Sequence, residues 1–160
     1  MPQYFAAVLA RREDKWIGDE IELGEIEDLD ALVEQVRDRA DGGTALLFLE
    51  EDDEYLAILR VDGDGDPRAF ITDSRAIVTS PLAALVMEDT PVDDAEDDED
   101  EGTRPEAEPA GDADIVKDLG INAKKLLALC AEKGMLPGDV VNAICEKVGC
   151  VDILDELRVV

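Results

Sequence analysis

An acidic stretch near the middle of the chain, residues 90–112, limits what the sequence can fold into. The stretch TPVDDAEDDEDEGTRPEAEPAGD holds eleven acidic residues, one basic residue and three prolines. With almost no apolar side chains, it cannot bury enough surface to offset the entropy lost on ordering, and its charges repel one another. We therefore expect a flexible, disordered acidic linker between folded parts at residues 1–89 and 113–160. The linker is either a solvated tether or an acidic arm that competes for a partner's nucleic-acid site.

Residues 1–89 have the pattern of an α+β domain with the element order ββαβββα. A hairpin is indicated by the apolar segments PQYFAAVLARRED and KWIGDEIEL. A helix is indicated by EDLDALVEQVRDRADGG, with Asp28 as its N-cap and Gly42-Gly43 as its end. The short apolar runs TALLFLE, EYLAILRV and RAFITD, separated by polar turns, favour an antiparallel meander. A last helix is expected to start at Ser80 and Pro81, a capping residue followed by the first helical position.

Three aspartates, Asp62, Asp64 and Asp66, stand at alternate positions between two of these expected strands. EF-hand calcium loops begin with the same spacing, but they need glycine at the sixth position and glutamate at the twelfth. Here those positions hold Pro67 and Asp73, and proline cannot adopt the positive φ that glycine supplies there. Asp-Gly pairs between strands are strong hairpin-turn signals. We therefore predict a turn at this place and no metal site.

After the linker the apolar spacing becomes helical, and it predicts a small helical bundle in residues 113–160. The segments ADIVKDLGI, NAKKLLALCAEKG and LPGDVVNAICEKVG each place apolar side chains on one face and end at glycine. Asn122 is the expected cap of the second helix. The final segment, VDILDELRVV, is expected to be either a last short helix or an extended tail. A bundle of only about 45 residues is marginal alone, and it can pack against the first domain.

The net charge of −27, from 42 acidic and 15 basic residues, restricts the partners of the chain. The linker accounts for −10 of this charge, which leaves −17 on the rest. Such a surface repels phosphate backbones and anionic lipids, so we expect no direct nucleic-acid binding and no membrane binding. A basic protein is the natural partner, although the acidity can also serve solubility alone. The oligomeric state stays open.

The one basic cluster of the sequence lies after the linker, and it is expected to be an ordinary helix surface. An RNA contact is the alternative, but the cluster has no interleaved aromatic residues on which bases could stack. Its members are Lys124, Lys125, Lys133 and Lys147.

The residue combinations of common catalytic sites are missing. The chain has no histidine, and therefore no Ser-His or Cys-His pair. It has neither a G-x-x-x-x-G-K nor a G-x-G-x-x-G phosphate-binding motif. Cys130, Cys145 and Cys150 lie in apolar helical patterns and are expected to be core residues rather than metal or redox sites. We therefore assign no catalytic, cofactor-binding or metal-binding residue and expect no cofactor.

The chain shows no pattern of a signal peptide or of a membrane span. Its odd number of cysteines, each in an apolar pattern, suits a reducing compartment. We therefore expect a cytoplasmic protein.

Motifs on both sides of the linker resemble the tRNA adenosine deaminase-associated proteins of actinobacteria. They are TDSRA...SPLA before the linker and DLGI...LLALC......LPGDVVNAI after it. These proteins take their name from a gene neighbour, the enzyme that converts the wobble adenosine of tRNA to inosine. The resemblance implies an association with that enzyme and defines no activity of its own. The chain cannot be the deaminase itself, because zinc-dependent base deaminases need H-x-E and P-C-x-x-C motifs, and neither is present.

Three functional hypotheses follow. The first is a non-catalytic accessory or regulatory protein that docks on the basic RNA-binding face of the deaminase, where it masks that face or stabilises the free enzyme. The second is a stand-alone module that binds a protein or a small ligand and has no direct role in tRNA editing. The third is an enzyme of unknown type. Salt-sensitive binding to the deaminase would distinguish the first from the other two.

Overall fold

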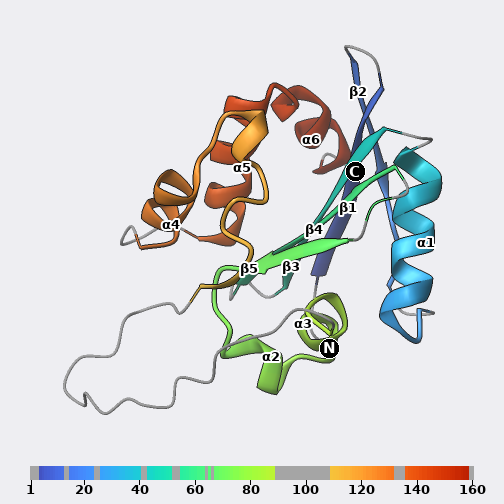
Figure 1. The fold of residues 1–160 in the computed structure, drawn as a ribbon, viewed down its shortest axis with the longest axis vertical. Coiled ribbons are helices and arrows are strands. Elements are labelled where there is room, and N and C mark those ends of the chain that lie inside the picture. The colour runs from blue at the N-terminus through green and yellow to red at the C-terminus, as the bar shows by residue number, and fades with distance from the viewer. Residues whose placement is uncertain are drawn as a thin grey trace.

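A six-stranded antiparallel sheet with helices on both faces forms the centre of the computed structural model (Figure 1). The structure describes residues 4–12, 15–23, 26–40, 43–51, 55–63, 65, 67–88, 109–131 and 136–158. Within these ranges the elements are β1 (Tyr4–Arg12), β2 (Lys15–Glu20), α1 (Leu29–Ala40), β3 (Thr44–Glu51), β4 (Tyr55–Asp62), β5 (Arg68–Ile71), α2 (Ala76–Thr79), α3 (Pro81–Val86), β6 (Ala110–Gly111), the 3₁₀ helix η1 (Lys117–Leu119), α4 (Ala123–Ala131), α5 (Pro137–Val148) and α6 (Val151–Arg158). The α+β class is confirmed, and the predicted order ββαβββα holds, with the predicted last helix as α3 and a short helix that was not predicted, α2, before it.

The strand order in the sheet is β2-β1-β3-β4-β5-β6. The predicted hairpin (β1 and β2) and the predicted meander (β3, β4 and β5) are both confirmed. Successive side chains of a strand point to opposite faces of a sheet. Leu47 and Leu59 therefore pack in one hydrophobic cluster, whereas Phe48 and Ile58 pack in the other. Because both faces are covered, these strands are apolar throughout, which explains why their sequences alternate so loosely.

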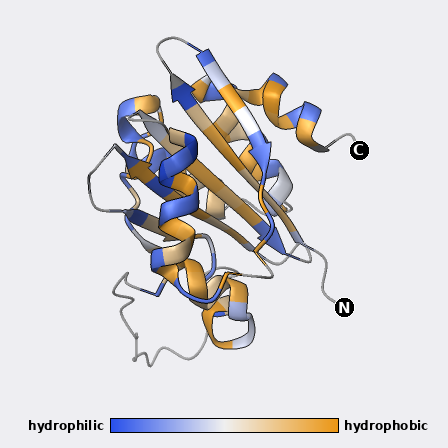
Figure 2. Ribbon diagram, turned by 90° about the vertical axis from the view of Figure 1, so that its right-hand side faces the viewer, coloured by the Kyte–Doolittle hydropathy of each residue, from blue (hydrophilic) through white to orange (hydrophobic). Residues whose placement is uncertain are grey.

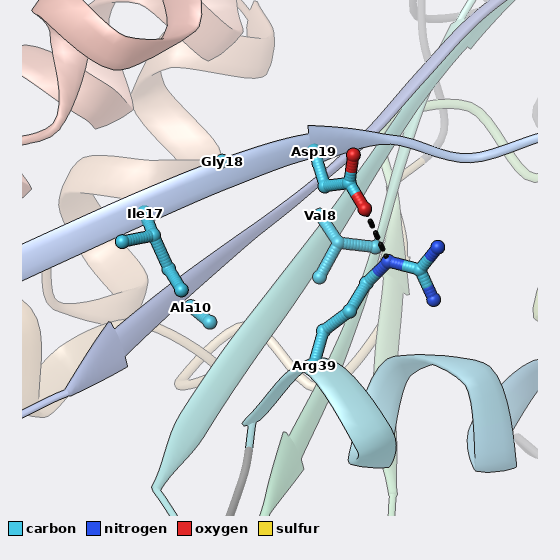
Figure 3. Close-up of a pocket in the computed structure, with 6 residues that line it drawn as sticks. All are labelled: Val8, Ala10, Ile17, Gly18, Asp19 and Arg39. Atoms are coloured by element: carbon cyan, nitrogen blue, oxygen red, sulfur yellow. Dashed lines mark hydrogen bonds and ion pairs between the residues drawn. The ribbon is translucent and has the colours of Figure 1, made fainter.

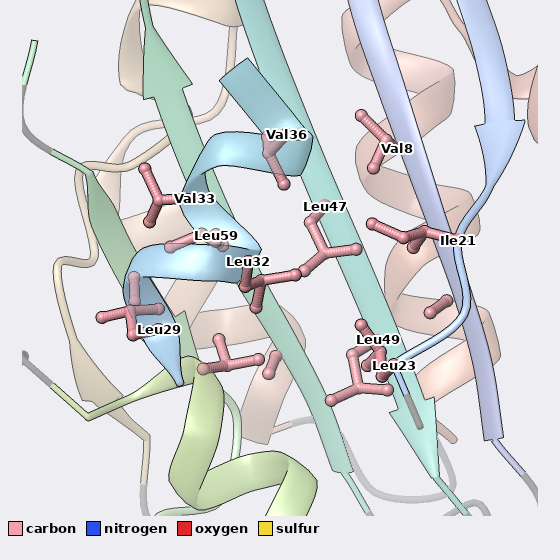
Figure 4. Packing of buried hydrophobic residues seen from close by; sticks show 14 of the residues in the cluster. Val8, Ile21, Leu23, Leu29, Leu32, Val33, Val36, Leu47, Leu49 and Leu59 are labelled. Carbon is pink, nitrogen blue, oxygen red and sulfur yellow. The ribbon is translucent and has the colours of Figure 1, made fainter. Parts of the chain in front are cut away.

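Helix α1 covers the first face of the sheet together with α2 and α3 (Figure 4). The side chain of Asp28 accepts a hydrogen bond from the backbone N–H of Ala31 at 2.9 Å, which confirms the predicted N-cap. Apolar residues at helical spacing point from α1 to the strands, while the outer surface of the helix is hydrophilic (Figure 2). The labelled members of this cluster in Figure 4 are Val8, Ile21, Leu23, Leu29, Leu32, Val33, Val36, Leu47, Leu49 and Leu59.

The C-terminal helices cover the second face of the sheet. Helix α5 contacts β3 and β4, and α6 contacts β1 and β2. The final segment is thus a helix and not an extended tail. Gly18 of β2 is needed for this packing, because a Cβ there would lie 2.5 Å from Ile153 Cγ2 of α6. The C-terminal helices therefore share a core with the sheet.

The predicted acidic linker, residues 90–112, lies outside the described residues up to position 108. Its last residues differ from the expectation, because Ala110 and Gly111 form β6 and pair with β5 at the edge of the sheet. Gly111 has a φ of 98°, and a Cβ there would lie 2.4 Å from the Ala69 carbonyl oxygen. Two small residues have no apolar pattern that could signal a strand. The chain thus returns to the sheet before it reaches the C-terminal helices.

The described helix ends of the C-terminal part follow the sequence signals, with one difference, while Gly134, the predicted end of α4, lies outside the described residues. Asn122 caps α4 by accepting a hydrogen bond from the Lys125 N–H at 2.8 Å. Gly149 ends α5 in the left-handed conformation, as predicted. The segment ADIVKDLGI, expected to be a short helix, forms turns and only three residues of 3₁₀ helix, because Ile115 and Val116 are buried in the second core. No helix among the described residues is long and apolar enough to cross a membrane.

Candidate functional site

The outer face of α1 is an acidic surface. Asp30, Glu34 and Asp38 are exposed on it. The two arginines of the helix are directed to other parts of the protein. Arg37 donates to the backbone carbonyls of residues 63 and 65 at 2.9 and 2.8 Å, and Arg39 donates from Nε to Asp19 Oδ2 at 3.0 Å. The cations are thus engaged at the sides of the helix, and carboxylates dominate the face that meets solvent.

A small pocket of about 210 Å³ lies between α1 and the β1–β2 hairpin (Figure 3). Apolar side chains of the two strands line it, and the ion pair between Asp19 and Arg39 closes one side. The lining residues are Val8, Ala10, Ile17, Gly18, Asp19 and Arg39. Pockets for small molecules usually measure about 300–1,000 Å³, so this one is better suited to a single apolar side chain. Ile17 is 43% exposed at this place.

A buried arginine links the sheet to the segment before α4. Arg60 of β4 is 4% exposed. Its guanidinium donates to both carboxylate oxygens of Asp118 at 2.7 and 2.8 Å and to the Ile115 carbonyl at 2.8 Å, and Nε donates to Asp62 at 3.0 Å. The hydrogen bond from Arg60 lowers the pKa of Asp118. Burial lowers the pKa of Arg60, but its hydrogen bonds with Asp118 and Asp62 outweigh that effect and raise it.

The three aspartates with calcium-like spacing fall at the turn between β4 and β5. The two strands are antiparallel neighbours, which confirms the hairpin. Asp64 and Asp66 lie outside the described residues, while Asp62 accepts hydrogen bonds from Arg60 and from Thr44 Oγ1. Within the part of the chain that the structure describes, no group of three or more Cys, Asp or Glu side chains could hold a metal ion. The absence of a calcium site stays a prediction.

A second polar cluster is buried where β3, β4 and α3 meet. Tyr55 Oη donates a hydrogen bond to Glu51 Oε1 at 2.8 Å, and the Ser80 hydroxyl donates to the same oxygen. Ser80 Oγ also accepts the backbone N–H of Ala83 at 3.2 Å, so it caps α3 as the sequence predicted. Glu51 is 7% exposed. The cluster brings a carboxylate and two hydroxyls together, but they satisfy one another inside the protein and fasten α3 to the sheet.

The cysteines and lysines singled out in the sequence are placed largely as expected. Cys145 and Cys150 are buried core residues. Cys130 packs against the same core, and burial raises the pKa of its thiol to about 11, which makes it a poor nucleophile at neutral pH. The lysines of the predicted cluster at positions 124, 125 and 147 are exposed on the helices. Lys133 lies outside the described residues.

Sequence reasoning missed the buried polar clusters and the pocket, because they depend on tertiary contacts. The Arg60 network, the Glu51 cluster and the pocket join residues that are far apart in the chain. Only the Ser80-Pro81 pair gave a usable signal, because capping is local.

Comparison with known protein families matched residues 4–151 to the family described as Rv3753c-like tRNA adenosine deaminase-associated protein. The match begins in β1 and ends at the first residue of α6. It therefore spans both the sheet and the helices that follow the acidic segment, and it agrees with the resemblance found in the sequence motifs. No curated protein and no solved structure matched the chain.

Proposed function

This chain belongs to the Rv3753c-like tRNA adenosine deaminase-associated protein family, and from that membership we propose that it is a non-catalytic accessory or regulatory protein of the tRNA adenosine deaminase. The family match over residues 4–151 is the observation that carries the proposal. The family description names an association with an enzyme and not an activity. A role in wobble adenosine-to-inosine modification also implies a place in the cytoplasm, where we propose that the protein works.

The charge distribution supports a basic partner and suggests where it docks. Residues 1–89 contain 23 acidic and eight basic side chains, whereas residues 113–160 contain eight acidic and six basic side chains. The acidity is thus concentrated in the part that carries α1 and in the linker. An enzyme that modifies tRNA must present a basic face to the RNA backbone. The exposed carboxylates of α1 form a surface that is complementary to such a basic face. Binding of this surface to the basic face of the enzyme would mask that face from tRNA.

A non-catalytic role is supported by the chemistry of the described side chains. The hydroxyls of Tyr55 and Ser80 are buried and bonded to Glu51. The Cys130 thiol has a raised pKa, which disfavours the reactive thiolate. The whole chain lacks histidine, the commonest general base. We also propose that the chain is organised as two folded parts, 1–89 and 113–160, that are joined by the acidic linker and packed together.

A stand-alone binding module is the second candidate, and the pocket beside α1 is the observation that favours it. A pocket of about 210 Å³ could take a small apolar group. Native mass spectrometry of the protein purified from its own cytoplasm would test this candidate, because a bound molecule would add a fixed mass to the chain.

Binding of the purified deaminase to two charge-reversal variants tests the proposal. Charges act over only roughly 8 Å at physiological salt, so only carboxylates at the docking surface should contribute to binding. We therefore expect Glu34→Lys/Asp38→Lys on α1 to weaken binding by at least about tenfold. The matched control Asp152→Lys/Asp155→Lys makes the same change in net charge at exposed positions of α6, and we expect it to bind nearly as well as the wild type. Equal losses in both variants would contradict docking on α1, and no binding of the wild type at low salt would contradict the accessory role.

A further inference from the structure

Strand β2 lies at the edge of the sheet and presents a surface that the fold leaves open. It pairs only with β1 in the described part of the sheet. Helix α6 packs on one side of it, while α1 packs on β1, β3 and β4. The side of β2 next to α1 therefore carries the exposed Ile17 above the pocket shown in Figure 3. An edge strand with an exposed apolar residue is a template for pairing with another strand.

The backbone groups that β2 directs outward can be identified from its register. Ile21 donates its N–H to the Ala6 carbonyl of β1 at 3.1 Å. Every second residue counted back from Ile21, including Ile17, therefore directs its backbone N–H and C=O groups to β1. The residues between them, including Trp16 and Gly18, direct these groups away from β1.

The side chains of β2 are complementary to a second copy of the same strand. Two antiparallel strands related by a two-fold axis at Ile17 would place Lys15 opposite Asp19, Ile17 opposite Ile17, and Trp16 opposite Gly18 of the other copy. Opposite charges and apolar pairs at facing positions both stabilise a sheet. Trp16 and Gly18 would exchange backbone hydrogen bonds, and Ile17 would lie at a non-hydrogen-bonded position, where side chains are closest.

Charge favours this edge over the outer face of α1 for contact between two copies. Residues 4–20 hold three basic and four acidic side chains, although the chain as a whole carries −27. Two copies that meet here avoid the acidic outer face of α1, so they repel each other less at this edge than they would at that face. A strongly basic partner would find more carboxylates elsewhere on the molecule.

We propose that the chain forms a two-fold dimer in which the β2 strands of two copies pair antiparallel about Ile17 and join their sheets. This interface is independent of the proposed docking to the deaminase, and the two respond to salt in opposite ways. Salt screens the repulsion between two chains of −27 and strengthens the dimer, whereas it weakens the attraction of an acidic surface for a basic enzyme.

Sedimentation velocity over a range of concentrations, at low and at high salt, tests the proposal. We expect a wild-type dimer that becomes tighter with salt, and an Ile17→Lys variant with a dimer dissociation constant at least roughly tenfold higher. Val78→Lys is the matched control, because Val78 is 88% exposed on α2, away from β2, and it should dimerise like the wild type. A wild type that stays monomeric at high salt, or an Ile17→Lys variant that dimerises normally, would overturn the proposal.

Cross-linking provides a second test that does not depend on a loss of binding. Ile17→Cys in a Cys130→Ser background should form a covalent dimer on oxidation, because facing residues at a non-hydrogen-bonded position have Cα atoms about 4.5 Å apart, within disulfide reach. Val78→Cys in the same background reports random collisions. Equal rates of cross-linking at the two positions would overturn the proposed register.

Discussion

Replacing Arg60 by methionine should loosen the C-terminal helices from the sheet. Arg60 is buried in β4, and its guanidinium holds the Ile115 carbonyl, Asp118 and Asp62 together. Methionine keeps an apolar stem of similar length but has no donor. The substitution therefore removes the polar link between β4 and the segment before α4 and leaves most of the surrounding packing in place.

The size of the effect follows from the exposure of each partner. The Ile115 carbonyl would lose a buried hydrogen bond, which costs about 1–3 kcal/mol. The side chain of Asp118 is 62% exposed, so its ion pair contributes only about 0–1 kcal/mol after solvent screening. We expect the free energy of unfolding to fall by about 1–4 kcal/mol in total.

Urea unfolding, followed by fluorescence of the single tryptophan, Trp16, measures this change, since Trp16 packs against the core that the C-terminal helices form. Amide exchange should locate the loss of protection in α5 and η1 rather than in β3. Arg75→Met is the control, because Arg75 is partly exposed and forms an ion pair with the nearby Asp73. This substitution should cost less than about 1 kcal/mol. A loss below about 0.5 kcal/mol in Arg60→Met would refute the linking role of this side chain.

Three further predictions concern pH, packing and metal. The pKa of Asp118 is lowered in the folded protein, so Asp118 stabilises the fold at any pH above its pKa in the unfolded chain, and this contribution is lost as the pH falls through its pKa in the folded protein. The difference in free energy of unfolding between wild type and Arg60→Met should therefore be smaller at low pH than at pH 7. Gly18→Ala should lower the free energy of unfolding by about 1–3 kcal/mol, because the new Cβ would lie 2.5 Å from Ile153 Cγ2, and a melting temperature equal to wild type would show that α6 does not pack there. Millimolar calcium should leave the melting temperature unchanged; a saturable increase that Asp64→Ala abolishes would establish a metal site at the turn after β4.

The elements that the sequence predicted well are those encoded by local signals. Asp28, Ser80 and Asn122 cap helices where their side chains predicted it, because a cap needs only the next three residues. The meander was predictable because short apolar runs were separated by polar turns. Gly149 ended a helix for an equally local reason.

Features that depend on contacts across the chain could not be predicted. Arg60 stands in an apolar run, and its partner Asp118 is 58 positions away. The chain has 42 acidic residues, and nothing in the sequence singles out Asp118 as the partner of Arg60. Strand β6 consists of alanine and glycine, which favour no strand on their own. The pocket beside α1 exists because the helix packs over β1 rather than β2, which is a result of tertiary packing.

Deaminase activity in the presence of this protein tests the accessory role most directly. The measurement is the rate of inosine formation in tRNA as the chain is added at fixed enzyme, first with limiting tRNA and then with excess tRNA. If the acidic surface masks the basic face of the enzyme, the rate should fall as the chain is added, and excess tRNA should restore it because both compete for one surface. An unchanged rate, with bound enzyme still able to take up tRNA, would contradict masking, and a lack of binding between the two folded proteins would contradict the association itself.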